Sequence, residues 1–269
     1  TWEDVMTKLA SLKTGSTKDR YEMAIQDSAL DLVRHRKLME TGADHFLSVL
    51  QAGTVSTNVY LRRFHQFALG MQWLPWPVLP RLQWPAIHYK DKRAITIEEH
   101  EKIIAREKNP EVNAYFRLLW HIGGAQSDVA TLTNENIDWN SRTIAFARKK
   151  TGVPVVVSFG EDAAAVLKSL PQSGPLFPRL SPMWEGHRAQ LFTRRLASVG
   201  ITGISLHSYR YAWAERAKCV GMPERYAQQA LGHSSKAFAR SYSKNARVIV
   251  PSLEEYEAKV IPLPRAVNQ

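Results

Sequence analysis

Apolar residues recur every three to four positions over three stretches of the first part of the chain, which is the spacing of amphipathic helices. These stretches cover residues 19–38, 43–50 and 56–69, and Gly53 and Gly70 close the second and third. Glycine is common just after the last turn of a helix, because it accepts the left-handed backbone found there. The pattern therefore predicts a small bundle of three or four helices, with its aromatic residues in the core.

A proline-rich stretch follows, with prolines at positions 75, 77, 80 and 85. Proline lacks the N–H that a helix needs, so this stretch predicts an extended connection between two domains. Its three tryptophans are too apolar for a free tether, and part of it is expected to pack on a domain. We place the first domain at 1–86, the linker at 87–94 and the second domain at 95–269.

The second domain is predicted to be mainly helical, with one small β-hairpin. Thr96 followed by Glu98 and Glu99 indicates a capped helix start, and Gly123 and Gly124 end an apolar helix over 112–124. β-Branched and aromatic residues flank the letters RKKTG, which predicts a hairpin. Further helices are predicted over 161–170, 184–199, 207–220 and 222–230, with a C-terminal tail helix over 251–262.

Composition narrows the possible partners. The 269 residues carry a net charge of +11, and 44% of them are hydrophobic, so two packed domains and a polyanionic partner are expected. The one cysteine, Cys219, excludes an internal disulfide and a cysteine zinc cluster, which fits a reducing cytoplasmic setting. Membrane-length apolar runs and a signal peptide are not seen. Because the chain starts at Thr1, a further N-terminal module is a possibility that we leave open.

A block of polar residues between 205 and 244 carries the candidate chemistry. His207 and Arg210 are three apart and share a helix face, His233 follows Gly232, and Tyr242 comes nine residues after His233. Each feature alone is ordinary, since a helical His–Arg pair is usually packed or solvated and L-G-H is usually a helix end. In this order the block resembles that of the tyrosine recombinases, the phage integrase family: H-x-x-R, then L-G-H, then a nucleophilic tyrosine.

The resemblance implies a catalytic role for each of these residues. Tyr242 would attack a DNA phosphate and form a 3′-phosphotyrosine, although a free phenol has a pKa of about 10 and needs activation. Arg210 would fork onto phosphate oxygens, while His207 and His233 would donate hydrogen bonds or move a proton. In the K-T-G form of the hairpin, Lys150 would protonate the leaving oxygen, with Lys149 as the neighbouring candidate. No cofactor or metal is implied.

One position departs from the family pattern. Gly123, Ser127, Asp128 and the letters NIDW match, but the arginine of T-G-x-R-x-S-E-L is replaced by Ala125. Arg117 cannot fill this position, because it lies about two turns earlier on the preceding helix. The resemblance then implies an inactive variant, with Asp128 bracing the site from behind. Either the chain is naturally degenerate or the arginine was replaced to stop turnover; retention of the other elements favours replacement.

The resemblance also implies how the protein acts on DNA. A helical core-binding domain and a mixed α/β catalytic domain would close around duplex DNA, and recombination would need a homotetramer on two sites, near the nucleoid and away from membranes. Two alternatives stay open: a catalytically degenerate DNA-binding regulator, and a type IB topoisomerase acting as a monomer. The basic residues expected at DNA, which could also be simple surface charge, are Arg62, Arg63, Lys90, Lys92, Arg93, Lys149, Arg188, Arg194 and Arg195.

Overall fold

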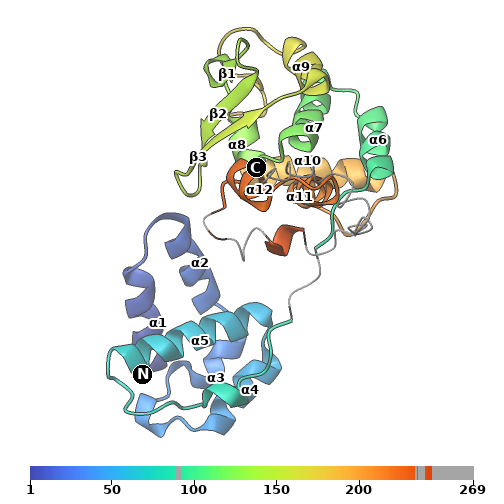
Figure 1. Ribbon diagram of the computed structural model, residues 1–269. Coiled ribbons are helices and arrows are strands. Elements are labelled where there is room, and N and C mark those ends of the chain that lie inside the picture. The colour runs from blue at the N-terminus through green and yellow to red at the C-terminus, as the bar shows by residue number, and fades with distance from the viewer. Residues whose placement is uncertain (89–91, 234, 236–239, 244–269) are drawn as a thin grey trace, which may run out of the picture. The chain divides into compact units, whose positions relative to one another are not determined.

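The computed structural model describes residues 1–88, 92–233, 235 and 240–243. Contacts within the chain divide it into two compact units, Thr1–Asp91 and Lys92–Gln269, seen in Figure 1. The functions expected for the two domains, core binding and catalysis, remain predictions. The tail helix expected over 251–262 lies outside the described residues, as does Lys90.

The first unit is built from short helices. A single helix was expected over 19–38, and this expectation is wrong. The helix stops at Ile25, and the side chain of Asp27 accepts a hydrogen bond from the Ala29 N–H, which starts a new 3-10 turn. The helices are α1 (Trp2–Ser11), α2 (Gly15–Ile25), α3 (Asp31–Arg34), α4 (Ala43–Ala52) and α5 (Val55–Gly70), with 3-10 turns η1 (Ser28–Leu30), η2 (Leu38–Glu40) and η3 (Arg81–Gln83).

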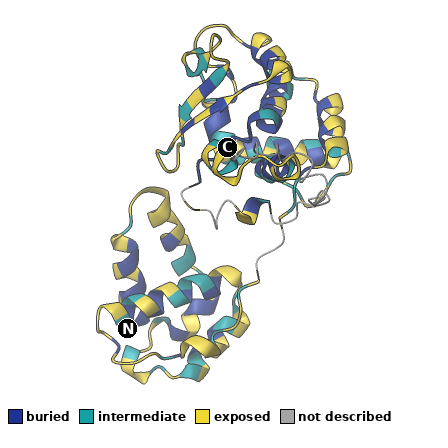
Figure 2. Cartoon of the chain, in the orientation of Figure 1, coloured by how far each residue is buried: buried dark blue, intermediate teal, exposed yellow. Residues whose placement is uncertain are grey.

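Aromatic side chains form the core of the first unit, as expected. Trp2 and Phe46 are fully buried and meet edge to face, with ring centroids 4.9 Å apart. The proline-rich stretch packs back on this core, because Trp84 contacts Phe46 and His65 with centroids 5.8 and 5.6 Å away. Figure 2 shows the buried positions of α1 and α5 facing the inside of the unit.

The second unit is mainly helical around a small antiparallel sheet in the order β1-β2-β3. Ile144 of the central strand β2 pairs with Ile137 on one side and Val157 on the other, and all three strands pack on the core. This is the expected fold class. Its elements are α6 (Ile97–Arg106), α7 (Pro110–Ile122), α8 (Gln126–Ala130), η4 (Asn134–Asn136), β1 (Ile137–Asp138), β2 (Thr143–Ala147), β3 (Pro154–Ser158), α9 (Glu161–Lys168), α10 (Glu185–Ser198), α11 (Ser208–Cys219) and α12 (Glu224–Ala230).

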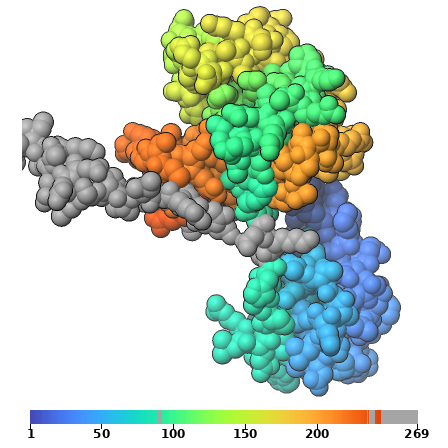
Figure 3. Space-filling model, turned by 90° about the vertical axis from the view of Figure 1, so that its right-hand side faces the viewer, coloured from blue at the N-terminus to red at the C-terminus, as the bar shows by residue number. Residues whose placement is uncertain are grey.

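Helix α7 is the central element of the second unit and contacts α6, α8, α9 and α11. In Figure 3 the green segment that contains α6 and α7 lies against both the yellow and the orange segments of this unit. The helix starts at the Asn109 cap and ends at Gly123, whose φ of 61° is left-handed. A Cβ on Gly123 would lie 2.6 Å from the Trp213 ring, so glycine permits the close approach of α7 and α11.

None of the helices in the described part of the chain has both the length and the apolar character needed to cross a bilayer.

Candidate active site

The four residues singled out by spacing meet at one place in the second unit. The Tyr242 hydroxyl lies 2.7 Å from Nε2 of His207, and the rings of Tyr242 and His233 have centroids 4.5 Å apart. The Arg210 guanidinium carbon lies 5.6 Å from the centroid of the Tyr242 ring, and Arg210 Nη2 lies 3.0 Å from Nε2 of His233. A phenol, a guanidinium and two imidazoles therefore lie in one cluster of side chains.

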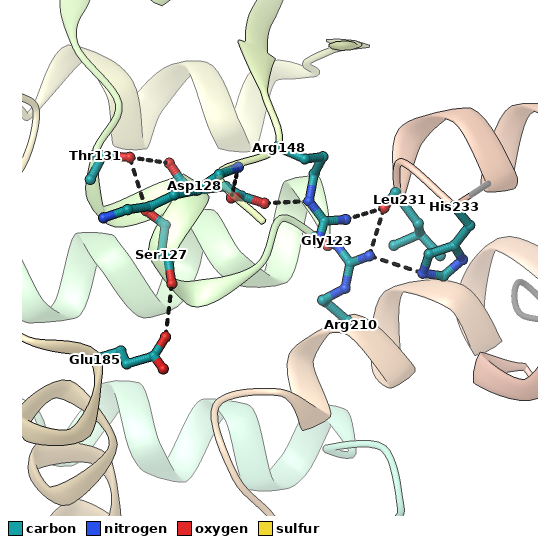
Figure 4. A network of polar contacts seen from close by, with 10 residues as sticks. Gly123, Ser127, Asp128, Thr131, Arg148, Glu185, Arg210, Leu231 and His233 are labelled. Atoms are coloured by element: carbon teal, nitrogen blue, oxygen red, sulfur yellow. Dashed lines mark hydrogen bonds and ion pairs between the residues drawn. The ribbon is translucent and has the colours of Figure 1, made fainter. Parts of the chain in front are cut away.

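Backbone carbonyls hold Arg210 in place. His207 is the residue just before α11 and Arg210 lies in its first turn, so the helix presents both on the same side. Arg210 Nη1 donates to the Gly123 carbonyl at 2.8 Å, and Nη2 donates to the Leu231 carbonyl at 2.6 Å. Figure 4 shows these bonds, which come from the ends of α7 and α12. Because the side chain is only 2% exposed, its position is set before any ligand arrives.

Burial keeps both histidines neutral at physiological pH. Burial first, and the nearby charge of Arg210 second, lower the pKa of His207 to about 4 and that of His233 to about 3. A neutral imidazole has one nitrogen with a free lone pair, so Nε2 of His207 can accept a proton from the Tyr242 hydroxyl. Burial also lowers the pKa of Arg210, to about 10, which leaves the guanidinium charged at neutral pH.

Tyr211 is a part of the site that spacing alone did not single out. Its ring stacks on that of Tyr242, with centroids 4.6 Å apart and planes 15° apart. It also meets the His207 ring at a centroid distance of 5.4 Å. Tyr211 follows His207 by four residues, and this helical spacing is the signal that would have placed it beside the site. Tyr242, which is 6% exposed, is thus held by rings on several sides.

The hairpin brings a second arginine, Arg148, to this cluster, although its place in the sequence indicated no role. Arg148 Nε lies 2.6 Å from Oδ2 of the buried Asp128, and Arg148 Nη1 donates to the Leu231 carbonyl. Oδ1 of Asp128 accepts the Lys149 backbone N–H at 3.0 Å. The alternation of β2 was the available signal, because Ile144 is buried, Phe146 is partly buried, and Arg148 comes next on that face.

Lys150 and Ala125 lie at the edges of this arrangement. Lys150 is exposed on the hairpin turn, and within the described residues its side chain forms neither a hydrogen bond nor an ion pair. Its charge is one of those that lower the pKa of His207. Ala125 is partly exposed and caps the start of α8, three residues before Asp128. Its methyl side chain offers no donor to a ligand.

Two of the three arginines expected on the surface of α10 have internal roles. Arg188 is 4% exposed and donates to the carbonyls of Leu180, at 3.0 Å, and Met183, so the expectation that it is exposed is wrong. The loop before α10 leaves carbonyls that need a donor, and Arg188 supplies it. Arg195 forms an ion pair at 2.8 Å with the buried Glu107. Arg194 is exposed, as expected.

The other candidate DNA contacts divide in the same way. Arg93 pairs with both carboxylate oxygens of Glu99 at 2.7 Å, and Arg62 donates to Asn58 at 2.7 Å and stacks on Trp84. The side chains of Arg93 and Arg62 therefore make contacts within the unit to which each belongs. The remaining described candidates, Arg63, Lys92 and Lys149, are exposed.

In the described part of the chain, no three histidine, cysteine or carboxylate side chains are grouped so that they could bind a metal ion. The site consists of arginine and histidine side chains around the phenol of Tyr242.

Comparisons with known proteins place this arrangement in a family. The Phage integrase family model matches residues 93–247, which include the whole site. No curated protein matches the chain by sequence. Solved structures do match by fold. The Tn1549 transposon integrase in complex with a circular intermediate DNA has a TM-score of 0.76 and 14% identity, over 96% of this chain and 98% of that one.

Lambda integrase is also similar in fold. Its dimer bound to a COC′ core site has a TM-score of 0.72 and 16% identity, over 94% of this chain and 98% of that one. Its tetramer bound to a Holliday junction has a TM-score of 0.64 and 18% identity, over 94% and 79%. The chain belongs to the phage integrase family, the tyrosine recombinases of DNA recombination and integration.

Proposed function

We propose that this protein is a site-specific recombinase that cuts and rejoins duplex DNA through a 3′-phosphotyrosine. Tyr242 Oη attacks the phosphorus, its proton passes to Nε2 of His207, and the bond from phosphorus to the 5′ oxygen breaks. Lys150 gives a proton to the 5′ oxygen that leaves. The observation that carries this proposal is the 2.7 Å contact between Tyr242 and His207, beside the guanidinium of Arg210.

The arrangement supports such a step without an external energy source. One phosphate ester replaces another, so the energy of the broken bond is retained in the phosphotyrosine and can drive resealing. His207, neutral because burial lowers its pKa to about 4, is ready to accept the phenolic proton. Arg210 is already fixed by two carbonyls, and a guanidinium that needs no reorganisation stabilises negative charge best. His233 and Asp128 support the site as a hydrogen-bond donor and as a brace.

We also propose that position 125 is where relatives carry the first of two catalytic arginines. The methyl side chain of Ala125 offers no donor to a phosphate, and the loss of one charged donor from such a site typically costs about 10² to 10³ in rate. A site in which Arg210 is the only arginine at the phosphate would therefore cleave DNA much more slowly. Whether the alanine is natural or introduced, the remaining site residues support cleavage chemistry as the original function.

The DNA partner and the assembly belong to the same proposal. Solved relatives are a dimer bound to a core site and a tetramer bound to a Holliday junction. A net charge of +11 favours the same kind of partner, because cations released from DNA drive binding. We assign phosphate contacts to the exposed Arg63, Lys92, Lys149 and Arg194, and a homotetramer on two DNA sites to the recombining state.

One experiment separates this proposal from its two rivals. The full chain, with alanine or arginine at position 125, is incubated with labelled duplexes of randomised core sequence that carry a nick, so that the released fragment diffuses away. A recombinase leaves a covalent adduct in a denaturing gel, whereas a DNA-binding regulator retains the DNA only under native conditions. Joined strands from two duplexes then distinguish recombination from a type IB topoisomerase, which would relax supercoiled plasmid without joining.

A further inference from the structure

The side chain of Arg148 approaches Arg210 from a different element. It leaves the end of β2, where its backbone is fixed by two bonds across the hairpin: its N–H donates to the Val153 carbonyl and its carbonyl accepts from the Gly152 N–H. The side chain is 12% exposed, and it ends at the Leu231 carbonyl that Arg210 also contacts. Figure 4 shows the two guanidinium groups meeting at this oxygen.

Gly232 makes this approach possible. A Cβ at this residue would lie 2.8 Å from Cγ of Arg148, which is closer than side-chain atoms come to each other. Its φ of 58° is also in the left-handed region, where a side chain is strained. The glycine between Leu231 and His233 therefore leaves room for the stem of an arginine, in the loop that carries a site histidine.

Among the described residues, the charges around Arg210 do not balance. Arg148 and Arg210 carry two positive charges, His207 and His233 are neutral at physiological pH, and the buried Asp128 supplies one negative charge. One positive charge is left over in a buried place, where it is costly unless an anion joins it. A DNA phosphodiester carries one negative charge and would complete the balance.

We propose that Arg148 is a catalytic residue that supplies the second guanidinium, in place of the arginine missing at position 125. This proposal rests on the proposed function. Arg210 and Arg148 would each donate to one non-bridging oxygen of the phosphate while Tyr242 attacks. In Arg148, Nε pairs with Asp128 and Nη1 donates to the Leu231 carbonyl. Nη2 of Arg148 has no hydrogen-bond partner among the described residues. That nitrogen is the donor available to the phosphate.

A consequence follows for the hairpin as a whole. Lys150, the proposed acid for the leaving oxygen, is two residues from Arg148 on the same turn, and the Lys149 N–H ties that turn to Asp128. Transition-state charge and leaving-group protonation would then come from one element. The protein would thus retain cleavage activity in spite of Ala125.

The test compares variants of the full chain by the rate of adduct formation with the nicked duplex pool of randomised core sequence. Arg148→Ala is expected to lower the rate about 10²- to 10³-fold. Arg148→Lys keeps the charge but loses the planar pair of donors of the guanidinium, and its rate is expected to lie between those of the wild type and Arg148→Ala. The matched control is Arg142→Ala, because Arg142 flanks the same strand but is exposed and pairs with Glu161. It is expected to keep the wild-type rate.

A restored arginine separates a chemical role from a structural one. Arg148→Ala leaves Asp128 buried without its ion-pair partner, so the variant could lose stability as well as activity. The double variant Arg148→Ala with Ala125→Arg has a guanidinium at the position where the family pattern has arginine. Its rate of adduct formation is expected to be at least about tenfold higher than that of Arg148→Ala. Native gel binding of the same pool shows whether each variant is folded and binds DNA.

The possible outcomes distinguish the two proposals. An adduct in the wild type that Arg148→Ala removes and Ala125→Arg restores supports both. An equal rate in the wild type and Arg148→Ala overturns the role of Arg148 and leaves the recombinase proposal in place. An adduct that forms only in variants with arginine at position 125 also overturns the role of Arg148 and leaves the recombinase proposal in place. If neither the wild type nor Ala125→Arg forms an adduct with DNA that it binds, the proposed function fails, and the role of Arg148 fails with it.

Discussion

Arg148 and Arg210 donate hydrogen bonds to the same acceptor, the carbonyl oxygen of Leu231. Two guanidinium groups of like charge rarely share a buried position unless an anion compensates them. Asp128 compensates one, at 2.6 Å from Arg148. These contacts join the hairpin, helix α8 and the loop after α12 into one charged cluster.

The Asp128–Arg148 ion pair is expected to stabilise the second unit. Asp128→Ala removes the acceptor of the Lys149 N–H and leaves the largely buried charge of Arg148 without its ion-pair partner, so the free energy of unfolding should fall by about 3 kcal/mol. The double variant with Arg148→Ala should lose less than the sum of the two single variants. Thermal unfolding followed by calorimetry measures both. Additive losses would show that the two side chains do not interact.

Stability should fall in mild acid. Burial lowers the pKa of His65 and His207 to about 4, and that of His100 and His233 to about 3, against an unfolded value of about 6.5. The unfolded chain takes up protons first, so the stabilisation is complete above about pH 6.5 and is lost progressively as the pH falls towards about 4.

Melting temperatures between about pH 7 and about pH 5 test this, and a temperature that does not change with pH would contradict it. His100→Gln should weaken the pH dependence, because His100 is buried and stacks on Trp120 with centroids 4.6 Å apart. His35→Gln, at an exposed residue, is the control. The rate of adduct formation should show no inflection near about pH 6.5, because His207 stays neutral there.

Two arginines of α10 should behave differently when they are replaced. Arg194 is exposed, so Arg194→Ala is expected to weaken DNA binding about equally for all sequences and to reduce the salt dependence of binding by about one phosphate contact. Arg188 is buried on backbone carbonyls, so Arg188→Ala should lower the melting temperature without changing that slope. Fluorescence anisotropy over a range of salt concentrations measures how steeply the affinity for DNA falls with salt. An unchanged salt dependence for Arg194→Ala would show that Arg194 does not contact DNA phosphate.

Local patterns were enough for the fold class and for much of the site. Helix caps such as Thr96 and Gly123, and the hairpin around RKKTG, predicted elements that the structure contains. The order and spacing shared with the tyrosine recombinases pointed to His207, Arg210, His233 and Tyr242, and the structure brings these side chains together.

Long-range pairing could not be predicted in the same way. The partner of Asp128 is 20 residues away on a hairpin, and the choice between Arg148 and its basic neighbours depends on strand register and on the space left by Gly232. Arg188 and Arg195 were expected on the surface because charge usually lies there, but carbonyls and a buried carboxylate elsewhere in the chain bind them.

The most direct test of the account is to identify the residue that carries DNA after cleavage. The adduct formed with the nicked duplex pool is digested with protease and nuclease, and the modified peptide is sequenced by mass spectrometry. The account predicts a nucleotide phosphate on Tyr242, and no adduct from Tyr242→Phe although that variant still binds DNA. A nucleotide on Tyr211 or another residue, or an adduct that persists in Tyr242→Phe, would contradict it.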